Sequence, residues 1–102
     1  MNKKSLIKYY HGEEKGFMHY VIYERDVVVL SEMDTKKVEY INENGNLNVT
    51  FNTDSKEFDL IGVKVITDKE YIKKVYNYMI ETNNAYFFDG YENLCVIKFD
   101  KK

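Results

Sequence analysis

The chain has 102 residues and a mass of 12.2 kDa, which is enough for one domain, residues 1–102, with one modest hydrophobic core. Hydrophobic residues make up 44% and charged residues 31%, a composition that excludes general disorder. Apolar stretches such as Val27 to Leu30 are far too short to span a bilayer, and Met1 to Ile7 lacks the apolar segment of a secretion signal. Cys95 is the only cysteine, so an internal disulfide is excluded. We therefore expect a cytoplasmic protein without a membrane partner.

The charges are nearly balanced, with fifteen basic and seventeen acidic side chains and a net charge of −2. Nucleic-acid-binding proteins usually carry a basic surface, and here the basic residues alternate with acidic ones. Arg25 is the only arginine, although arginine is the side chain best suited to bidentate contacts with guanine or phosphate. We therefore expect no nucleic-acid partner.

Three strands in close succession are predicted at the start of the chain. Ser5 to His11 is rich in β-branched and aromatic residues, and the loop of residues 12–16 carries two glycines. Phe17 to Tyr23 is the second strand, and residues 24–26 form a tight polar turn. Val27 to Ser31 is almost purely apolar, as expected of a strand covered on both faces. The three strands form an antiparallel meander.

A change of period then predicts a short helix and a half-buried strand. Either Asp34 or Thr35 can cap the helix, which has Val38 and Ile41 on one side and ends at residues 42–45. From Leu47 to Phe51 apolar and polar residues alternate strictly, which predicts a strand with one buried face.

The rest of the chain predicts strand, helix and strand. Phe58 to Ile66 is a strand whose internal Gly62 indicates a bulge or a close approach. Residues 67–70 fit a capping box in which Thr67 and Glu70 satisfy each other's free amides. The helix behind it has an apolar stripe formed by Ile72, Val75, Tyr76 and Met79. Asn83-Asn84 ends the helix, Tyr86 to Tyr91 is an aromatic connector, and Leu94 to Phe99 is the last strand. The order β-β-β-α-β-β-α-β predicts a mostly β, antiparallel barrel with two helices.

The junction between the third strand and the first helix is a candidate binding site. Lys36 and Lys37 stand at the start of the helix, where the helix dipole disfavours positive charge. Together with the hydroxyls of Ser31 and Thr35 they suit a bound phosphate. The alternative is that both lysines are simply solvated beside the neighbouring acids, which are Glu32, Asp34 and Glu39. The residue types alone do not decide between these two interpretations.

Other chemistry-bearing residues favour structural roles. His11 and His19 flank the first hairpin, but without a paired carboxylate pattern they do not indicate zinc. We expect them to be surface or ring-stacking residues, and we expect no metal. Cys95 alternates within an apolar strand and is expected to be a buried thiol. Ten tyrosines and six phenylalanines indicate core filling and a dimer interface, or alternatively a platform for a planar ligand.

Two segments resemble the pyridoxamine-5′-phosphate-oxidase-like FMN-binding split-barrel family. The first, VVVLSEMDTKKVEYINENGNLNVTF, has that family's apolar strand ending at Leu30-Ser31, its Thr35-Lys36-Lys37 helix start and its turn into an alternating strand. The second, IGVKVITDKEYIKKVYNYM, resembles the family's glycine-containing strand, acidic turn and amphipathic helix, with Gly62 at the glycine position. In element order the resemblance covers nearly the whole chain, which is similar to a small member of the family.

The resemblance implies a split barrel that binds FMN between the subunits of a homodimer. It places Lys36 and Lys37 on the FMN phosphate with help from Ser31 and Thr35. It also places a set of residues along the ribityl chain and ring, which are Leu30, His19, Val21 and, where full oxidases often carry a glutamine, Glu57. The implied activity is that of a flavin-dependent oxidoreductase whose small-molecule redox substrate is unknown. The alternative is a cofactor-free barrel that serves as a small binding or interaction module.

Overall fold

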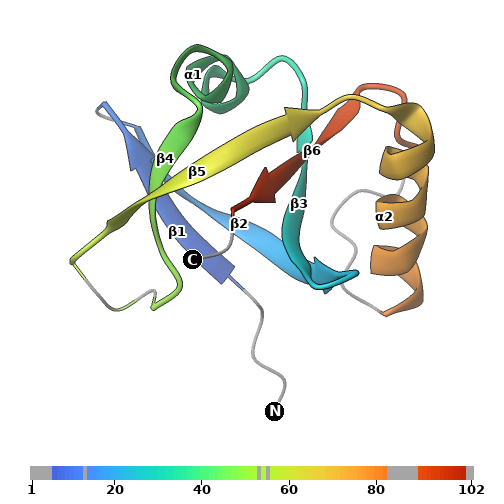
Figure 1. The fold of residues 1–102 in the computed structure, drawn as a ribbon, viewed down its shortest axis with the longest axis horizontal. Coiled ribbons are helices and arrows are strands. Elements are labelled where there is room, and N and C mark those ends of the chain that lie inside the picture. Colours follow the sequence, from blue (N-terminus) through green and yellow to red (C-terminus); the bar gives the residue numbers. More distant parts are fainter. Residues whose placement is uncertain (1–5, 13, 53, 55, 83–89, 101–102) are drawn as a thin grey trace.

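The computed structural model describes residues 6–12, 14–52, 54, 56–82 and 90–100 (Figure 1). Ser5, Asn83, Asn84 and the first part of the predicted connector, residues 86–89, lie outside the described residues.

The elements follow the predicted order of strands and helices. They are β1 (Leu6–His11), β2 (Glu14–Tyr23), β3 (Asp26–Glu32), α1 (Lys36–Asn44), β4 (Asn46–Thr50), β5 (Asp59–Ile66), α2 (Lys69–Glu81) and β6 (Leu94–Phe99). The strands form a closed barrel in the order β1-β2-β3-β6-β5-β4, and every neighbouring pair is antiparallel. The predicted fold class, a mostly β antiparallel barrel with two helices, is therefore confirmed.

The first hairpin is tighter than the sequence indicates. β2 begins at Glu14, which pairs with His11, so the predicted five-residue loop shrinks to the two positions between them. Gly12 takes a positive φ of 57°, which the turn requires, but Gly16 is part of β2 and pairs with Tyr9. Gly16 is therefore not part of the turn, and it allows the Tyr9 side chain to approach β2 closely.

The second hairpin confirms the predicted tight turn. Glu24 and Arg25 have φ values of 50° and 72°, and they join Tyr23 directly to Asp26. Two successive positive φ angles are typical of the type I′ turn, whose twist matches that of the flanking strands.

The two helices differ in how they begin. The Thr35 hydroxyl caps α1 by accepting a hydrogen bond from the Val38 amide at 3.2 Å, and Gly45 ends the helix in the left-handed conformation. The capping box predicted for α2 is wrong. Its N-cap is Asp68, one residue later than predicted, and no side chain caps it by a hydrogen bond. Starting the helix one residue later moves Glu70 out of the third helical position, from which it could reach back to the cap.

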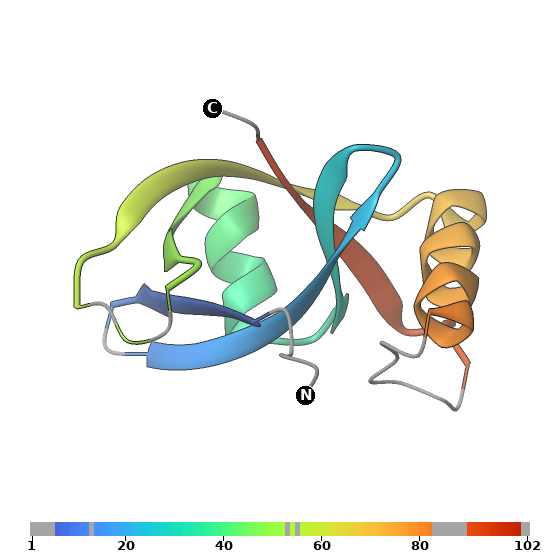
Figure 2. The same cartoon turned by 90° about the horizontal axis from the view of Figure 1, so that it is seen from below.

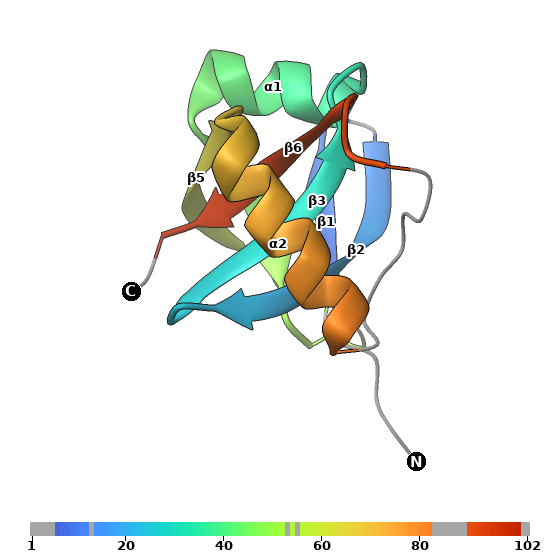
Figure 3. The same ribbon diagram turned by 90° about the vertical axis from the view of Figure 1, so that its right-hand side faces the viewer.

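Apolar side chains fill two layers separated by the sheet. The barrel interior holds residues from every strand and from α1, among them Ile7, Val29, Leu47 and Phe99. On the outer face of β2, β3 and β6, the apolar stripe of α2 packs on Val21, Val28 and Val96 (Figure 3). The third strand is thus covered on both faces, as its composition predicts, because Val29 faces the interior and Val28 faces α2.

The helices lie at different places on the barrel (Figure 2). α1 covers the barrel end beside β4 and β5, and α2 lies on the side formed by β2, β3 and β6. Neither α1 nor α2 is long and apolar enough to cross a membrane, and no other helix is present among the described residues.

Candidate functional site

The candidate site is the start of α1, which follows β3 in the chain and lies at one end of the barrel (Figure 1). Besides capping α1, the Thr35 hydroxyl lies 3.5 Å from the Glu32 carbonyl oxygen, to which it can donate. The hydroxyl thus orders the helix start. The backbone amides of Lys36 and Lys37 belong to the first turn of α1 and therefore have no acceptor within the helix. They can donate to a ligand bound at this end.

Lys36 and Lys37 extend in different directions, because successive residues on a helix do not face each other. Lys36 is exposed and lines an open groove of about 500 Å³ beside α1. Lys37 is half-buried, and its Nζ lies 5.5 Å from the centroid of the Tyr9 ring. The structure therefore places the two lysines at one helix end without joining them into a single clamp.

The groove beside Lys36 is predominantly acidic. Asp34, Glu39 and Glu43 line it together with Lys36, and the remaining lining residues are Met33, Thr35, Val38 and Asn42. Three carboxylates against one ammonium give the groove a net negative charge, which opposes the approach of a phosphate dianion. Anion binding at this end therefore depends on Lys36, Lys37 and the backbone amides.

Lys37 lies in a partly dehydrated position at the barrel end. Burial lowers the pKa of its amine, and the nearby Cys95 thiol and Glu32 carboxylate partly oppose that lowering. The same burial raises the pKa of the Cys95 thiol, against a smaller lowering by Lys37. Cys95 is fully buried, as predicted, and its thiol is held in the protonated form.

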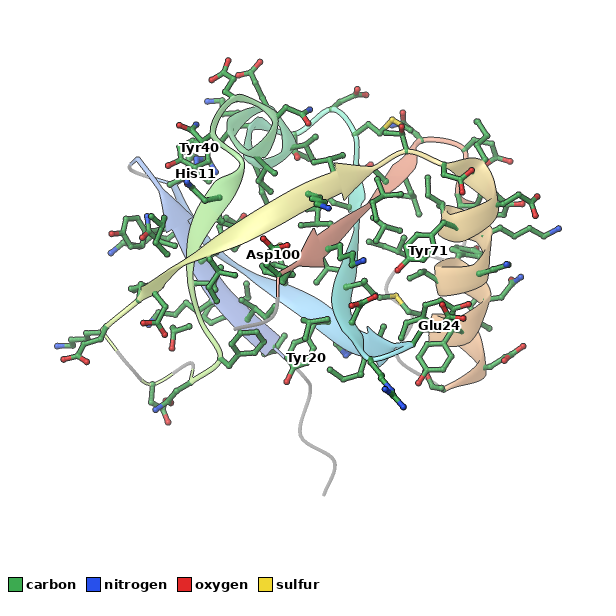
Figure 4. All side chains as sticks on the ribbon, in the orientation of Figure 1. His11, Tyr20, Glu24, Tyr40, Tyr71 and Asp100 are labelled. Atoms are coloured by element: carbon green, nitrogen blue, oxygen red, sulfur yellow. The ribbon has the colours of Figure 1, made fainter. Side chains whose placement is uncertain are left out.

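Three stacked rings, those of Tyr9, His11 and Tyr40, lie beside Lys37, and no sequence pattern predicted that these three meet. The His11 ring stacks on the Tyr9 ring at a centroid distance of 6.0 Å and on the Tyr40 ring of α1 at 5.0 Å. Figure 4 shows His11 next to Tyr40. Gly16 provides room for the Tyr9 ring, since a Cβ at that position would lie 2.8 Å from the Tyr9 Oη. The only signal in the sequence was that Tyr9 and His11 alternate along a strand, which places both rings on one face.

The remaining predicted site residues are either buried in the protein or lie away from the start of α1. Ser31 is buried, and its hydroxyl donates to the Glu32 carbonyl at 3.1 Å. Val21 is buried beneath α2, and the half-buried Leu30 packs against the same cluster. His19 is half-buried on β2, and Glu57 is exposed in the segment before β5. Their roles in cofactor binding stay predictions.

The two histidines lie on opposite faces of the first hairpin. His11 follows the inward positions of Ile7 and Tyr9, whereas His19 shares the outward face of Val21. Among the described residues no group of three or more His, Cys, Asp or Glu side chains is placed to hold a metal ion.

Comparison with known proteins gives one informative likeness. The sequence matches no protein-family model, and no curated protein matches it significantly. The fold is similar to a crystal structure of a provisionally assigned pyridoxamine 5′-phosphate oxidase from Listeria innocua, with a TM-score of 0.62 and 13% identity. The match covers 93% of this chain and 80% of that chain. At this identity the likeness establishes a shared split-barrel fold, in agreement with the barrel described above.

Proposed function

We propose that this barrel binds FMN, with the phosphate at the start of α1, and works as a flavin-dependent oxidoreductase in the cytoplasm. One observation carries the proposal. Thr35-Lys36-Lys37 begins a capped helix directly after β3, in a barrel that shares its fold with a provisionally assigned pyridoxamine 5′-phosphate oxidase. When bound, FMN would supply one- and two-electron redox chemistry.

The start of α1 fits a phosphate group. The amides of Lys36 and Lys37 and the exposed Lys36 ammonium are hydrogen-bond donors, and the helix dipole favours negative charge there. The Lys37 ammonium, which lies over the Tyr9 ring, is a second cation in the first turn of the helix. Thr35 and Ser31 act on the backbone, because both hydroxyls are engaged in hydrogen bonds around Glu32 and the helix start.

The rest of the FMN molecule requires a surface that one chain does not provide. Val21 and Leu30 lie under α2 and offer no open face to a flavin ring. We therefore propose a homodimer in which a second copy completes the ring site. Large exposed apolar side chains support an association of this kind, notably Phe17 and Leu60, which are 58% and 59% exposed.

A second candidate function is a cofactor-free barrel that acts as a small binding or interaction module. It is favoured by the three carboxylates in the groove beside Lys36. Their negative charge weakens the attraction for a phosphate dianion.

Flavin titration separates the two candidates. Protein purified without added flavin is examined by absorption spectroscopy and then titrated with FMN and with riboflavin, following flavin fluorescence. We expect FMN binding, with a Kd about ten- to a hundredfold weaker in Lys36→Ala/Lys37→Ala, since one charged hydrogen bond contributes roughly 1.5–3 kcal/mol. Riboflavin, which lacks the phosphate, should bind both proteins equally.

Lys73→Ala is the matched control, because Lys73 is an exposed lysine on α2. Its FMN affinity should equal that of the parent. An absence of FMN binding by the parent would favour the cofactor-free barrel. Equal weakening of FMN and riboflavin by the double substitution would show that the lysines act through the fold. Light scattering that gives the mass of one chain would refute the homodimer.

A further inference from the structure

The sequence offers two residues for the N-cap of α1, Asp34 and Thr35, and the structure selects Thr35. Were Asp34 the cap, its carboxylate would accept from the amides of the second and third helical positions, which would then be Lys36 and Lys37. Because Thr35 is the cap instead, its hydroxyl accepts from the Val38 amide. The amides of Lys36 and Lys37 donate to no acceptor among the described residues. They are therefore open to the phosphate of FMN, which the proposed function places at the start of α1.

Asn93, the residue before β6, contacts the loop that leads from β3 into α1. Its carbonyl oxygen accepts from the Met33 amide at 3.0 Å, and its side-chain Nδ2 donates to the Asp34 Oδ2 at 3.4 Å. Among the residues that the structure describes, no amide of α1 donates to the Asp34 carboxylate. The backbone bond to Met33 does not depend on the Asn93 side chain. A substitution of Asn93 therefore changes the partner of Asp34 without releasing the loop.

We propose that Asn93 is a positioning residue, which engages the Asp34 carboxylate and thereby leaves the first-turn amides of α1 available to a phosphate group. This role rests on the proposed function, in which FMN binds at the start of α1. A carboxylate one residue before the cap and a phosphate are attracted by the same amides and by the same helix dipole, so they compete for that place. Without the Asn93 side chain, the Asp34 carboxylate should accept from Lys36 or Lys37 and weaken phosphate binding.

The hydrogen bonds of Asp34 are tested first, without any ligand, through the amide signals of Lys36 and Lys37 in a nitrogen–proton correlation spectrum. In Asn93→Ala the amide proton of Lys36 or Lys37 should move downfield, because a new hydrogen bond to a carboxylate deshields it. In Asn93→Ala/Asp34→Ala the downfield shift should disappear, since the carboxylate is gone. Amide signals of Lys36 and Lys37 that stay in place in Asn93→Ala would overturn the proposal.

Ligand affinity is tested next with FMN. Asn93→Ala should raise the FMN Kd about two- to fivefold, because Asp34 and Asn93 are exposed and an exposed hydrogen bond contributes at the low end of the usual range. In an Asp34→Ala background Asn93→Ala should leave the Kd unchanged, because Asn93 acts through Asp34. The matched control is Asn77→Ala, which removes an exposed asparagine from α2 and should retain the affinity of the parent. An equal rise of the Kd in both backgrounds would overturn the proposal.

Two further arms keep the result decisive. If circular dichroism shows that Asn93→Ala does not fold, Asn93→Asp keeps the shape of the side chain, removes its donor and should change the amide signals and the FMN Kd in the same directions. If the parent binds FMN and Asn93→Ala binds it equally well, the role of Asn93 fails and the proposed function stands. If the parent does not bind FMN, the proposed function fails, and the same comparison with inorganic phosphate decides the role of Asn93. An absence of phosphate binding as well would overturn that role.

Discussion

Substitution of Gly16 by alanine tests the packing of Tyr9 against β2. A Cβ at Gly16 would lie 2.8 Å from the Tyr9 Oη and 3.0 Å from two carbon atoms of its ring. The ring has little room to retreat, because His11 stacks on it and the Lys37 ammonium lies over it. The alanine therefore overpacks the barrel end.

The magnitude follows from two opposing contributions. Alanine in place of glycine stabilises by about 0.4–1 kcal/mol, because it restricts the unfolded chain. Overpacking costs about 1–3 kcal/mol when neighbours must shift. We expect a net loss of about 1–2 kcal/mol in the free energy of unfolding. For a domain of this size that loss corresponds to a decrease of roughly 4 to 16 °C in Tm.

Thermal unfolding followed by circular dichroism measures the effect. The matched control is Gly16→Ala in a Tyr9→Leu background, where the shorter side chain removes the clash and the alanine should be neutral or stabilising. The difference between the two backgrounds is the coupling energy of positions 9 and 16. A Gly16→Ala variant of the parent with an unchanged or higher Tm would refute the reasoning.

Three further predictions concern turns, caps and pH. Arg25→Gly should stabilise by about 0.5–1 kcal/mol, because Arg25 has a φ of 72° that favours glycine, and a lower urea midpoint would contradict this. Thr35→Ala should destabilise by about 1 kcal/mol in urea unfolding, since it removes the cap of α1, while Thr35→Ser should retain stability. Burial, and to a lesser extent Asp26 and Glu24, raises the pKa of Tyr71 above 10.0. The protonated Tyr71 hydroxyl therefore contributes fully to stability below about pH 10, and this contribution is lost as the pH rises through the raised pKa. Stability of Tyr71→Phe should therefore fall less above pH 10 than that of the parent, and identical pH curves would contradict the assignment.

Much of the fold could be predicted because the apolar pattern is periodic. The alternation that begins at Leu47 and the stripe from Ile72 to Met79 each determine which side of an element is buried, independently of the rest of the chain. Element ends were less predictable. Both Gly12 and Gly16 are compatible with a turn, and only the pairing of Tyr9 with Gly16 shows that the second glycine belongs to a strand. The predicted N-cap of α2 was one residue too early for a similar reason, since Thr67 and Asp68 are both residue types that favour the N-cap position.

The candidate site was predictable in position but not in geometry. Thr35, Lys36 and Lys37 do begin α1, as the sequence indicates. The Lys37 ammonium lies over the ring of Tyr9, which is 28 positions earlier in the sequence and belongs to β1, the strand that pairs with β4 directly after α1. No local pattern contains that information. The enclosure of Val21 by α2 likewise arises from the packing of distant elements.

The place of β6 in the barrel has a consequence for the order in which the protein can fold. β6 follows the other five strands in the chain, yet it lies between β3 and β5 and pairs with both. While a ribosome makes the chain, β3 and β5 therefore each keep an open edge until residues 94–99 have emerged. Open edges pair readily with other chains, so incomplete chains are exposed to aggregation during this interval. The rate of synthesis and the supply of chaperones should consequently affect the yield of this protein strongly. The effect should be smaller for a barrel in which the last strand to be synthesised does not lie between two earlier strands.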